Sequence, residues 1–281
     1  MTRLWAVLRR KKSYLASAGL LMLFILMAIF GPMLYPHGLP TSNTQYYAPP
    51  SWKYPLGTDY AGVSVLAEVI VGARYVLFVA AMAAVLTMAI GVVIGLLAGF
   101  LGGVTDAVLM RVTDFVLTIP TYPLLIVIAA VVKISGPLAM AGVLSINGWG
   151  GMVRAVRSMV LSLKRRDFVE AARSLELGNT HLILRQILPL IMPYVIMHLV
   201  LAVTGAIYGE VGLFFLGLVP ISGTNWGVML NFAYSASGAI YVPSSVFYLM
   251  APVGAIVLVQ IGSVGFTKAL DEVFNPQINA L

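Results

Sequence analysis

The sequence predicts an all-α protein that crosses a membrane several times, and three observations support this fold class. Of its 281 residues, 60% are hydrophobic and 10% are charged, whereas a soluble domain carries about 25% charged residues. Six apolar runs approach the length of about 20 residues that spans a bilayer as a helix. Most basic residues also lie in alternate connections between these runs. We therefore expect a polytopic bundle of six transmembrane helices.

The N-terminal region holds the first of these helices. Residues 1–13 are rich in Arg and Lys and are expected in the cytoplasm. Residues 14–35 form an uncharged run that is long enough to span. Gly31-Pro32 and Pro36 stand where a cleaved signal peptide would have small residues, so we expect this helix to be retained. Residues 36–71 are then an extracytoplasmic loop rich in Pro, Tyr and Ser.

Residues 72–268 form the expected core domain, with five further spans. The fifth of the six apolar runs is interrupted by Pro189, Pro193 and Glu210. Residues 269–281 are expected to be a cytoplasmic tail. The five core spans are residues 75–101, about 115–132, about 134–153, about 186–218 and about 245–267.

The second span carries a row of glycines at intervals of four residues. This spacing places small residues on one face of a helix, where a neighbouring helix can approach closely. We therefore predict a tight helix–helix contact, with no implication for substrate. The row consists of Gly91, Gly95, Gly99 and Gly103.

The net charge of +7 is explained by membrane orientation better than by a nucleic-acid partner. If the N-terminus is cytoplasmic, all of the 17 basic residues except Lys53, Arg74 and Lys133 fall on the cytoplasmic side. This distribution follows the positive-inside rule. We expect both termini in the cytoplasm, the bilayer as a partner, and no nucleic acid.

Few ionisable residues lie near or within the spans. A carboxylate within the membrane is costly and is a functional hypothesis by default, so Glu210 is either near a translocation path or, as we favour, a hydrogen-bonded structural residue. Residues 219–244 suit a partly buried loop lining a cavity, or an ordinary outer loop with interfacial aromatics. Asn225 and Trp226 in this segment are grouped with Glu210 as candidates for the translocation path. Asp114 could pair with Arg111, three residues away.

The charged segment between the fourth and fifth spans has the pattern of a short amphipathic helix. Its apolar positions at i, i+3, i+4 and i+7 are Phe168, Ala171, Ala172 and Leu175, and Gly178 is expected to end the helix. Such a helix suits docking into a groove of a soluble partner, although a solvated connecting loop has the same pattern. The candidate docking residues are Asp167, Phe168, Glu170, Ala171, Ala172, Arg173, Leu175 and Gly178.

Motifs of catalysis are absent from the sequence. No phosphate-binding GxxxxGK[ST] loop, HExxH motif or nucleophile elbow occurs, and the chain has no cysteine. We expect no catalytic residue, metal site or cofactor on this chain. If ATP drives the protein, another subunit must bind it.

Two short motifs in this cytoplasmic segment resemble the EAA loop of ABC-importer permeases. They are Glu170-Ala171-Ala172 and Ile187-Leu188-Pro189, within a loop of about residues 158–185. In that family the loop is a coupling helix that seats in a groove of the ATPase subunit. The family usually has glycine where this chain has Glu176, and Gly178 is expected to supply the turn instead.

Further motifs resemble the dipeptide and oligopeptide permeases, and specifically their C-type subunits. The resemblance spans nearly the whole chain, although Val63-Ser64 after Gly62 departs from the family pattern. The matching motifs are Leu56-Gly57-Thr58-Asp59, Gly72-Ala73-Arg74, Glu210 with Phe215-Leu216-Gly217-Leu218, Asn225-Trp226-Gly227, Ala269-Leu270-Asp271 and Asn275-Pro276.

This resemblance implies a type I ABC importer permease in the inner membrane. Its partners would be a B-type homologous permease, two ATPase subunits that carry ATP and Mg²⁺, and an extracellular binding protein. Peptide is the leading substrate, with oligosaccharide, nickel or glutathione as alternatives, because the family includes importers of all of these.

Two other readings remain at this point. A secondary transporter would want polar residues paired across broken helices at the membrane midplane, and only Glu210 and His198 offer any. A structural or assembly protein would transport nothing. Substrate-stimulated ATP hydrolysis on adding the partner subunits would separate the importer from both.

Overall fold

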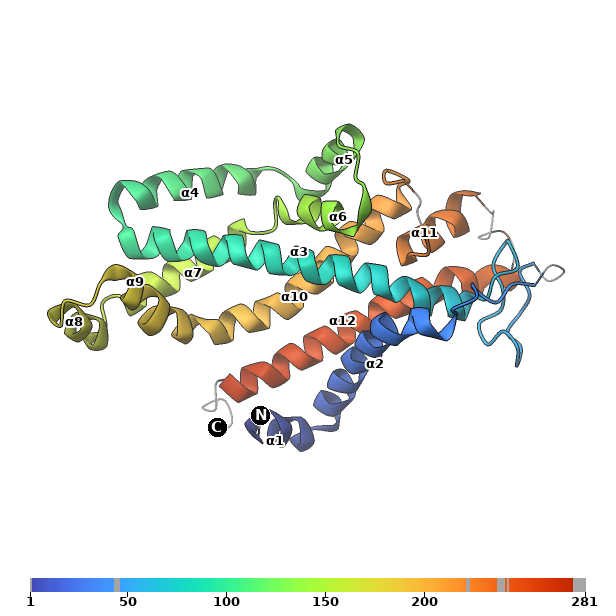
Figure 1. Cartoon of the computed structure of the whole chain (residues 1–281), viewed down its shortest axis with the longest axis horizontal. Helices are drawn as coiled ribbons and strands as arrows, with labels where there is room; N and C mark the ends of the chain where they lie inside the picture. The colour runs from blue at the N-terminus through green and yellow to red at the C-terminus, as the bar shows by residue number, and fades with distance from the viewer. Residues whose placement is uncertain (1, 43–45, 221–222, 237–240, 242, 275–281) are drawn as a thin grey trace.

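The computed structural model describes residues 2–42, 46–220, 223–236, 241 and 243–274, and this part of the chain is almost entirely helical. Within it, β pairing is confined to two isolated bridges, Thr41 with Val63 and Thr58 with Ser64, in the loop after the first long helix. The helices form an elongated bundle with that loop at one end (Figure 1). The short helix α8 (Asp167–Ser174), the first described helix and the end of the last one lie toward the opposite end.

The N-terminal helices are α1 (Thr2–Arg10) and α2 (Lys12–Leu34). The prediction of a first span is therefore confirmed, with a helix two residues longer at its start. The final helix, α12 (Val246–Phe274), packs against both of them. Ala269 of α12 is buried with Val7 and Leu8 of α1. The predicted tail thus begins as packed helix up to Phe274, and the remainder lies outside the described residues.

The central helix is α3 (Val65–Leu101), which packs against α2, α6, α7 and α10. It starts ten residues before the predicted second span, at residue 65 instead of 75. The added residues include Glu68 and Arg74. A search for uncharged runs therefore stops short of the helix's true outer end.

Two helical pairs follow, and both are broken. The first pair is α4 (Gly103–Thr118) and α5 (Thr121–Val131), which meet at an angle of 84°. Pro120 causes this break, because proline disfavours helical backbone at the residue before it. The second pair is α6 (Gly136–Ser145) and α7 (Gly150–Leu163).

The expected six spans are matched in part by the described helices. Four helices in the described part are long and apolar enough to cross a membrane, or five if the bent α4–α5 pair counts as one. The predicted fourth span is divided at residues 146–149. Asn147 and its neighbouring glycines favour a turn here. The apolar residues on both sides keep the mean hydropathy high, so the turn does not show in the hydropathy pattern.

Two short helices and a π-helical segment precede the helix of the predicted fifth span. After α8 (Asp167–Ser174) and α9 (Asn179–His181), a π-helical segment (Leu182–Ile187) leads into α10 (Leu188–Phe215). Pro189 lies in the first turn of α10, where proline is tolerated, and Pro193 lies inside it. The predicted interruptions therefore do not end the helix.

At the end of the bundle that carries the loop after α2, α11 (Trp226–Asn231) packs against α3, α10 and α12. A π-helical turn (Phe232–Ala236) and a 3₁₀ turn (Pro243–Ser245) lie between it and α12. Trp226, Val228, Met229 and Ala233 are buried. The described part of this segment is thus partly buried. Of the two aromatic residues expected at the membrane interface, Trp226 is buried and Tyr234 is exposed.

Candidate coupling surface and the helices that support it

The short helix α8 is held against the bundle by one face. Val169 and Ala172, three residues apart, are 0% and 5% exposed. Both belong to a core cluster that includes Val160 of α7 and Leu182 and Ile187 of the π-helical segment. This packing fixes the rotation of α8 about its axis.

A neighbouring face of α8, about 90° round the helix axis from the buried one, is open. Phe168, Ala171 and Leu175 lie at i, i+3 and i+7 and are exposed, with Leu175 at 73%. Three apolar side chains, two of them large, thus remain uncovered at the charged end of the bundle. The predicted stripe is therefore corrected in one member, because Ala172 faces the chain's own core instead of the solvent.

The remaining predicted docking residues lie around this open face. Asp167 and Glu170 are exposed in the first turn of α8, where acidic side chains favour the helix dipole. Ser174 Oγ donates to the Glu170 carbonyl at 3.1 Å. The backbone of Arg173 lies in the same helix.

The end of α8 differs from the sequence prediction. The N–H of Leu177 donates to the Ala172 carbonyl at 3.2 Å, and Glu176 has a φ of +54°. This bond and this left-handed residue form the Schellman motif that ends many helices. Glu176, and not Gly178, therefore makes the turn. Gly178 has a φ of −60° and caps the start of α9.

The glycine row of α3 forms the predicted close contact, and its partner is α7. A Cβ added at Gly91, Gly95 or Gly99 would lie 2.7 Å from the Cβ of Met152, Val156 or Val160 respectively. Each glycine thus receives one side chain from α7. Gly103 does not take part, since it begins α4 with a φ of +55° and has nothing within 4 Å of an added Cβ.

Sequence reasoning missed the α7 side of this contact. Met152, Val156 and Val160 recur every four residues, which is the same interval as the glycines. Matching the two periods along the chain would have been a signal for the pairing.

Ion pairs join α7 to α4 beside this contact. Arg157 Nε and Nη2 donate to Asp106 Oδ1 and Oδ2 at 2.5 and 2.6 Å. Arg154 Nη2 donates to Asp114 Oδ1 at 2.6 Å. The expected pairing of Asp114 with Arg111 is therefore wrong, because α7 brings a cation closer. Bidentate geometry of this kind fixes direction as well as distance.

The three candidates for a translocation path come together in a buried junction. Glu210 is 0% exposed and Asn225 is 2% exposed. Asn225 Nδ2 donates to Glu210 Oε1 at 2.7 Å, and Gly227 N–H donates to Asn225 Oδ1 at 2.7 Å. Trp226 Nε1 donates to the Val69 carbonyl at 3.0 Å. These side chains tie α11 to α10 and α3, an arrangement that supports the structural reading of Glu210.

The loop between α2 and α3 owes its shape to the Leu56–Asp59 motif. Gly57 has a φ of +75°, and an added Cβ would meet the Ala48 carbonyl. Asp59 Oδ1 accepts the N–H groups of Ala61 and Val63 at 2.9 and 2.6 Å. Burial raises the pKa of the Asp59 carboxyl above its usual value, although these backbone donors oppose the shift.

Comparisons with known proteins agree with these features. The profile described as binding-protein-dependent transport system inner membrane component matches residues 91–276. The profile described as N-terminal TM domain of oligopeptide transport permease C matches residues 1–50.

Two relatives from Bacillus subtilis (strain 168) are similar along most of their length. The oligopeptide transport system permease protein OppC is 34% identical over 281 residues, covering 98% of this chain and 90% of the relative. The dipeptide transport system permease protein DppC is 37% identical over 227 residues, covering 79% of this chain and 71% of the relative. The chain therefore belongs to the family of binding-protein-dependent transport system inner membrane components, as a multi-pass C-type permease subunit of the oligopeptide and dipeptide branch and not as the ATPase.

Proposed function

We propose that this chain is one membrane subunit of an ATP-driven importer that moves di- and oligopeptides delivered by an extracellular binding protein. The observation that carries the proposal is the exposed apolar face of α8, formed by Phe168, Ala171 and Leu175. Exposed apolar side chains in a charged region mark a protein–protein contact. The names of both Bacillus subtilis relatives, which refer to peptide transport, support the substrate class.

The proposed complex contains a B-type homologous permease and two ATPase subunits. ATP and Mg²⁺ bind to the ATPase subunits, and α8 seats in a groove of one of them. Helix-in-groove recognition uses apolar anchors at i, i+3 and i+7, which is the spacing of the three exposed residues. Oligosaccharide, nickel or glutathione remain alternative substrates for the same machinery.

The proposed topology has six crossings, with α4–α5 and α6–α7 each forming one broken crossing. Both termini and α8 are then cytoplasmic, and the loop after α2 and α11 are external. Single cysteines placed at Ser51 and Ser162 should react with an impermeant label from opposite sides of the membrane. Labelling of Ser162→Cys from outside intact cells would reverse this orientation.

The transmission of motion follows from the contacts of α8. Val169 and Ala172 belong to the core cluster that includes Val160 of α7, and α8 contacts the π-helical segment that leads into α10. The glycine contact joins α7 to α3, and two ion pairs join it to α4. A rigid displacement of α8 by the ATPase would therefore move α7 and α4 together. The breaks between α4 and α5 and between α6 and α7 would allow this movement.

The proposed function is tested by Leu175→Ser, with Leu138→Ser as a matched control. Both leucines are exposed, at 73% and 63%, and Leu138 lies in α6. Leu175→Ser should weaken ATPase recruitment about tenfold, since anchors of this kind contribute about 1–2 kcal/mol or more. Peptide-stimulated ATP hydrolysis and uptake in lipid should fall with it. Equal recruitment by both variants would mean that α8 is a solvated connector.

The substrate is tested separately, in the same reconstituted complex. Peptides should stimulate ATP hydrolysis in the presence of the binding protein, whereas oligosaccharides, nickel and glutathione should not. Glu170→Ala should reduce this stimulation more than it reduces ATPase binding if its carboxylate makes a charge-assisted contact. Stimulation by an oligosaccharide alone would leave the importer function in place and change the proposed substrate from peptide to sugar.

A further inference from the structure

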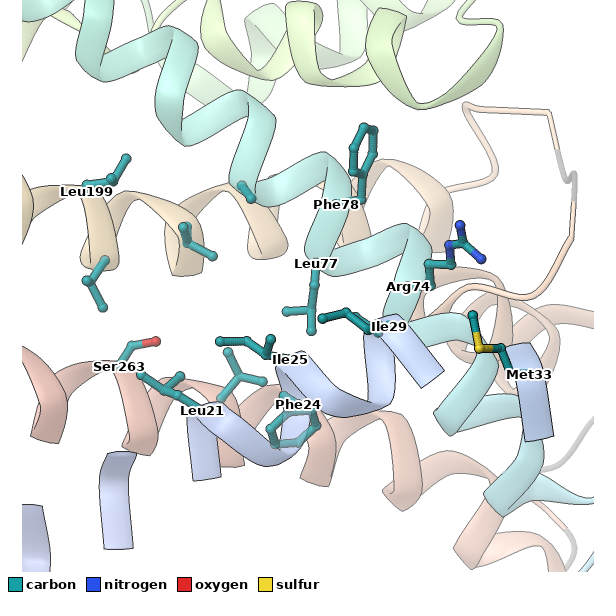
Figure 2. Close-up of a pocket in the computed structure, with 15 residues that line it drawn as sticks. Leu21, Phe24, Ile25, Ile29, Met33, Arg74, Leu77, Phe78, Leu199 and Ser263 are labelled. Atoms are coloured by element: carbon teal, nitrogen blue, oxygen red, sulfur yellow. The ribbon is translucent and has the colours of Figure 1, made fainter. Parts of the chain in front are cut away.

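An apolar groove runs along the side of the bundle between α2, α3, α10 and α12 (Figure 2). Its volume is about 620 Å³, within the range of about 300–1,000 Å³ that holds a small molecule. Among the fifteen described residues that line it, only Arg74 and Ser263 are polar. The lining therefore fits a hydrocarbon chain.

The groove matches one leaflet of a bilayer in length. Along α2 its lining runs from Leu21 to Met33, a distance of about 18 Å at about 1.5 Å per helical residue. Half of a hydrocarbon core is about 15 Å thick. Met33 lies near the outer end of α2, so the groove extends from about the midplane to the outer surface in the proposed orientation.

A single cation stands at the outer end of this groove. Arg74 lies next to Met33, and its guanidinium points away from the apolar side chains (Figure 2). Arg74 is exposed and forms no ion pair or hydrogen bond with the residues that the structure describes. Guanidinium is the group best suited to bind phosphate with two parallel hydrogen bonds.

We propose that this groove binds a phospholipid of the outer leaflet, with one acyl chain along α2 and the phosphate on Arg74. The three observations that carry the proposal are the apolar lining, the one-leaflet length and the unpaired cation at the correct end. Lipid bound here would also cover exposed or half-buried apolar side chains of α2, α3 and α10. The site is independent of the coupling surface and of the transported substrate.

The first test measures phospholipid retained by the purified transporter complex, reconstituted with phosphatidylglycerol as the only phospholipid. Ala81→Trp fills the groove, because Ala81 is an exposed lining residue. Arg74→Gln removes the charge. Matched controls are Val93→Trp, which is exposed on α3 outside the groove, and Lys133→Gln, another outer cation.

The complex should retain a phospholipid after extensive delipidation. Ala81→Trp should lose it, Arg74→Gln should bind it about tenfold more weakly, and both controls should behave as the unmodified complex. Retention that is unchanged in both groove variants would overturn the proposal.

A second test covers the case in which Ala81→Trp fails to assemble. A photo-crosslinking residue at Ile25, which lines the groove, should capture lipid in the assembled complex. Capture of a helix from another subunit at this position would show that protein, and not lipid, occupies the groove.

Discussion

The side-chain amide of Asn147 donates to the backbone carbonyl of Ile119 at 3.1 Å and to Thr121 Oγ1 at 3.2 Å. Asn147 lies in the break between α6 and α7, and Ile119 lies in the break between α4 and α5. A broken helix leaves carbonyl groups without intrahelical donors, and the membrane interior has no water to replace them. Asn147 therefore supplies a donor to the first break from the second, and this hydrogen bond allows the two breaks to lie side by side.

Replacing the Asn147 amide with an apolar side chain of similar size should destabilise the bundle. Asn147→Leu leaves the Ile119 carbonyl without its donor, at a cost of about 1–3 kcal/mol. The melting temperature of the purified complex should fall measurably. Thr118→Val is the control, since Thr118 is an exposed neighbour whose hydroxyl bonds only within its own helix. Equal melting of the two variants would mean that the amide is dispensable.

The glycine contact between α3 and α7 should tolerate no added atoms. Gly95→Ala places a Cβ 2.7 Å from the Cβ of Val156, and overpacking costs about 1–3 kcal/mol. Gly95→Leu should reduce assembled complex further. Gly254→Ala on α12 is the matched control, because an added Cβ there meets nothing within 4 Å. Normal yield of Gly95→Leu would show that α7 can move away freely.

The long helices were predictable from apolar length, whereas the breaks were not. The runs behind α2, α10 and α12 are long enough to be recognised by composition alone. The division at residues 146–149 depends on a hydrogen bond that reaches Ile119, 28 residues away. A property of distant backbone cannot be read from the local hydropathy.

The coupling helix was also found from its spacing, but its orientation was not. The helix α8 and the residue that follows it present two apolar faces, Val169 with Ala172 and Phe168 with Ala171 and Leu175. Periodicity assigns residues to faces without saying which face meets the bundle. That choice is made by Leu182 and Ile187 of the following segment, whose position is set by tertiary packing.

The two ion pairs between α4 and α7 should differ in strength. The side chains of Arg157 and Asp106 are 31% and 17% exposed, whereas those of Arg154 and Asp114 are 54% and 51% exposed. In double-mutant cycles on melting, the less exposed Arg157–Asp106 pair should show about 1.5–3 kcal/mol of coupling. The more exposed Arg154–Asp114 pair should show about 0.2–1 kcal/mol. Arg157→Lys should lose most of the coupling to Asp106, because lysine cannot form two parallel hydrogen bonds to a carboxylate. Equal couplings would show that burial does not separate the pairs.

The buried junction of Glu210 and Asn225 should depend on shape and hydrogen bonding instead of charge. Glu210→Gln keeps an oxygen that can accept the Asn225 amide, so transport and stability should be nearly unchanged. Glu210→Ala leaves Asn225 without its acceptor and opens a cavity, and should cost about 2–4 kcal/mol. Peptide uptake and melting of both variants measure this. A loss of uptake in Glu210→Gln with normal melting would assign the charge a role in transport.

The last prediction concerns the end of α8, where Glu176 takes the conformation that glycine normally supplies. Left-handed backbone costs a residue with a side chain about 1–2 kcal/mol, while glycine adopts it freely but loses more entropy on ordering. Glu176→Gly should therefore stabilise the helix end by up to about 1 kcal/mol, and the Leu177 amide should exchange its hydrogen more slowly by as much as about fivefold. Gly178→Ala is the matched control, because Gly178 has ordinary backbone angles and nothing lies within 4 Å of an added Cβ. Faster exchange in Glu176→Gly, or strong destabilisation by Gly178→Ala, would show that Gly178, and not Glu176, ends the helix.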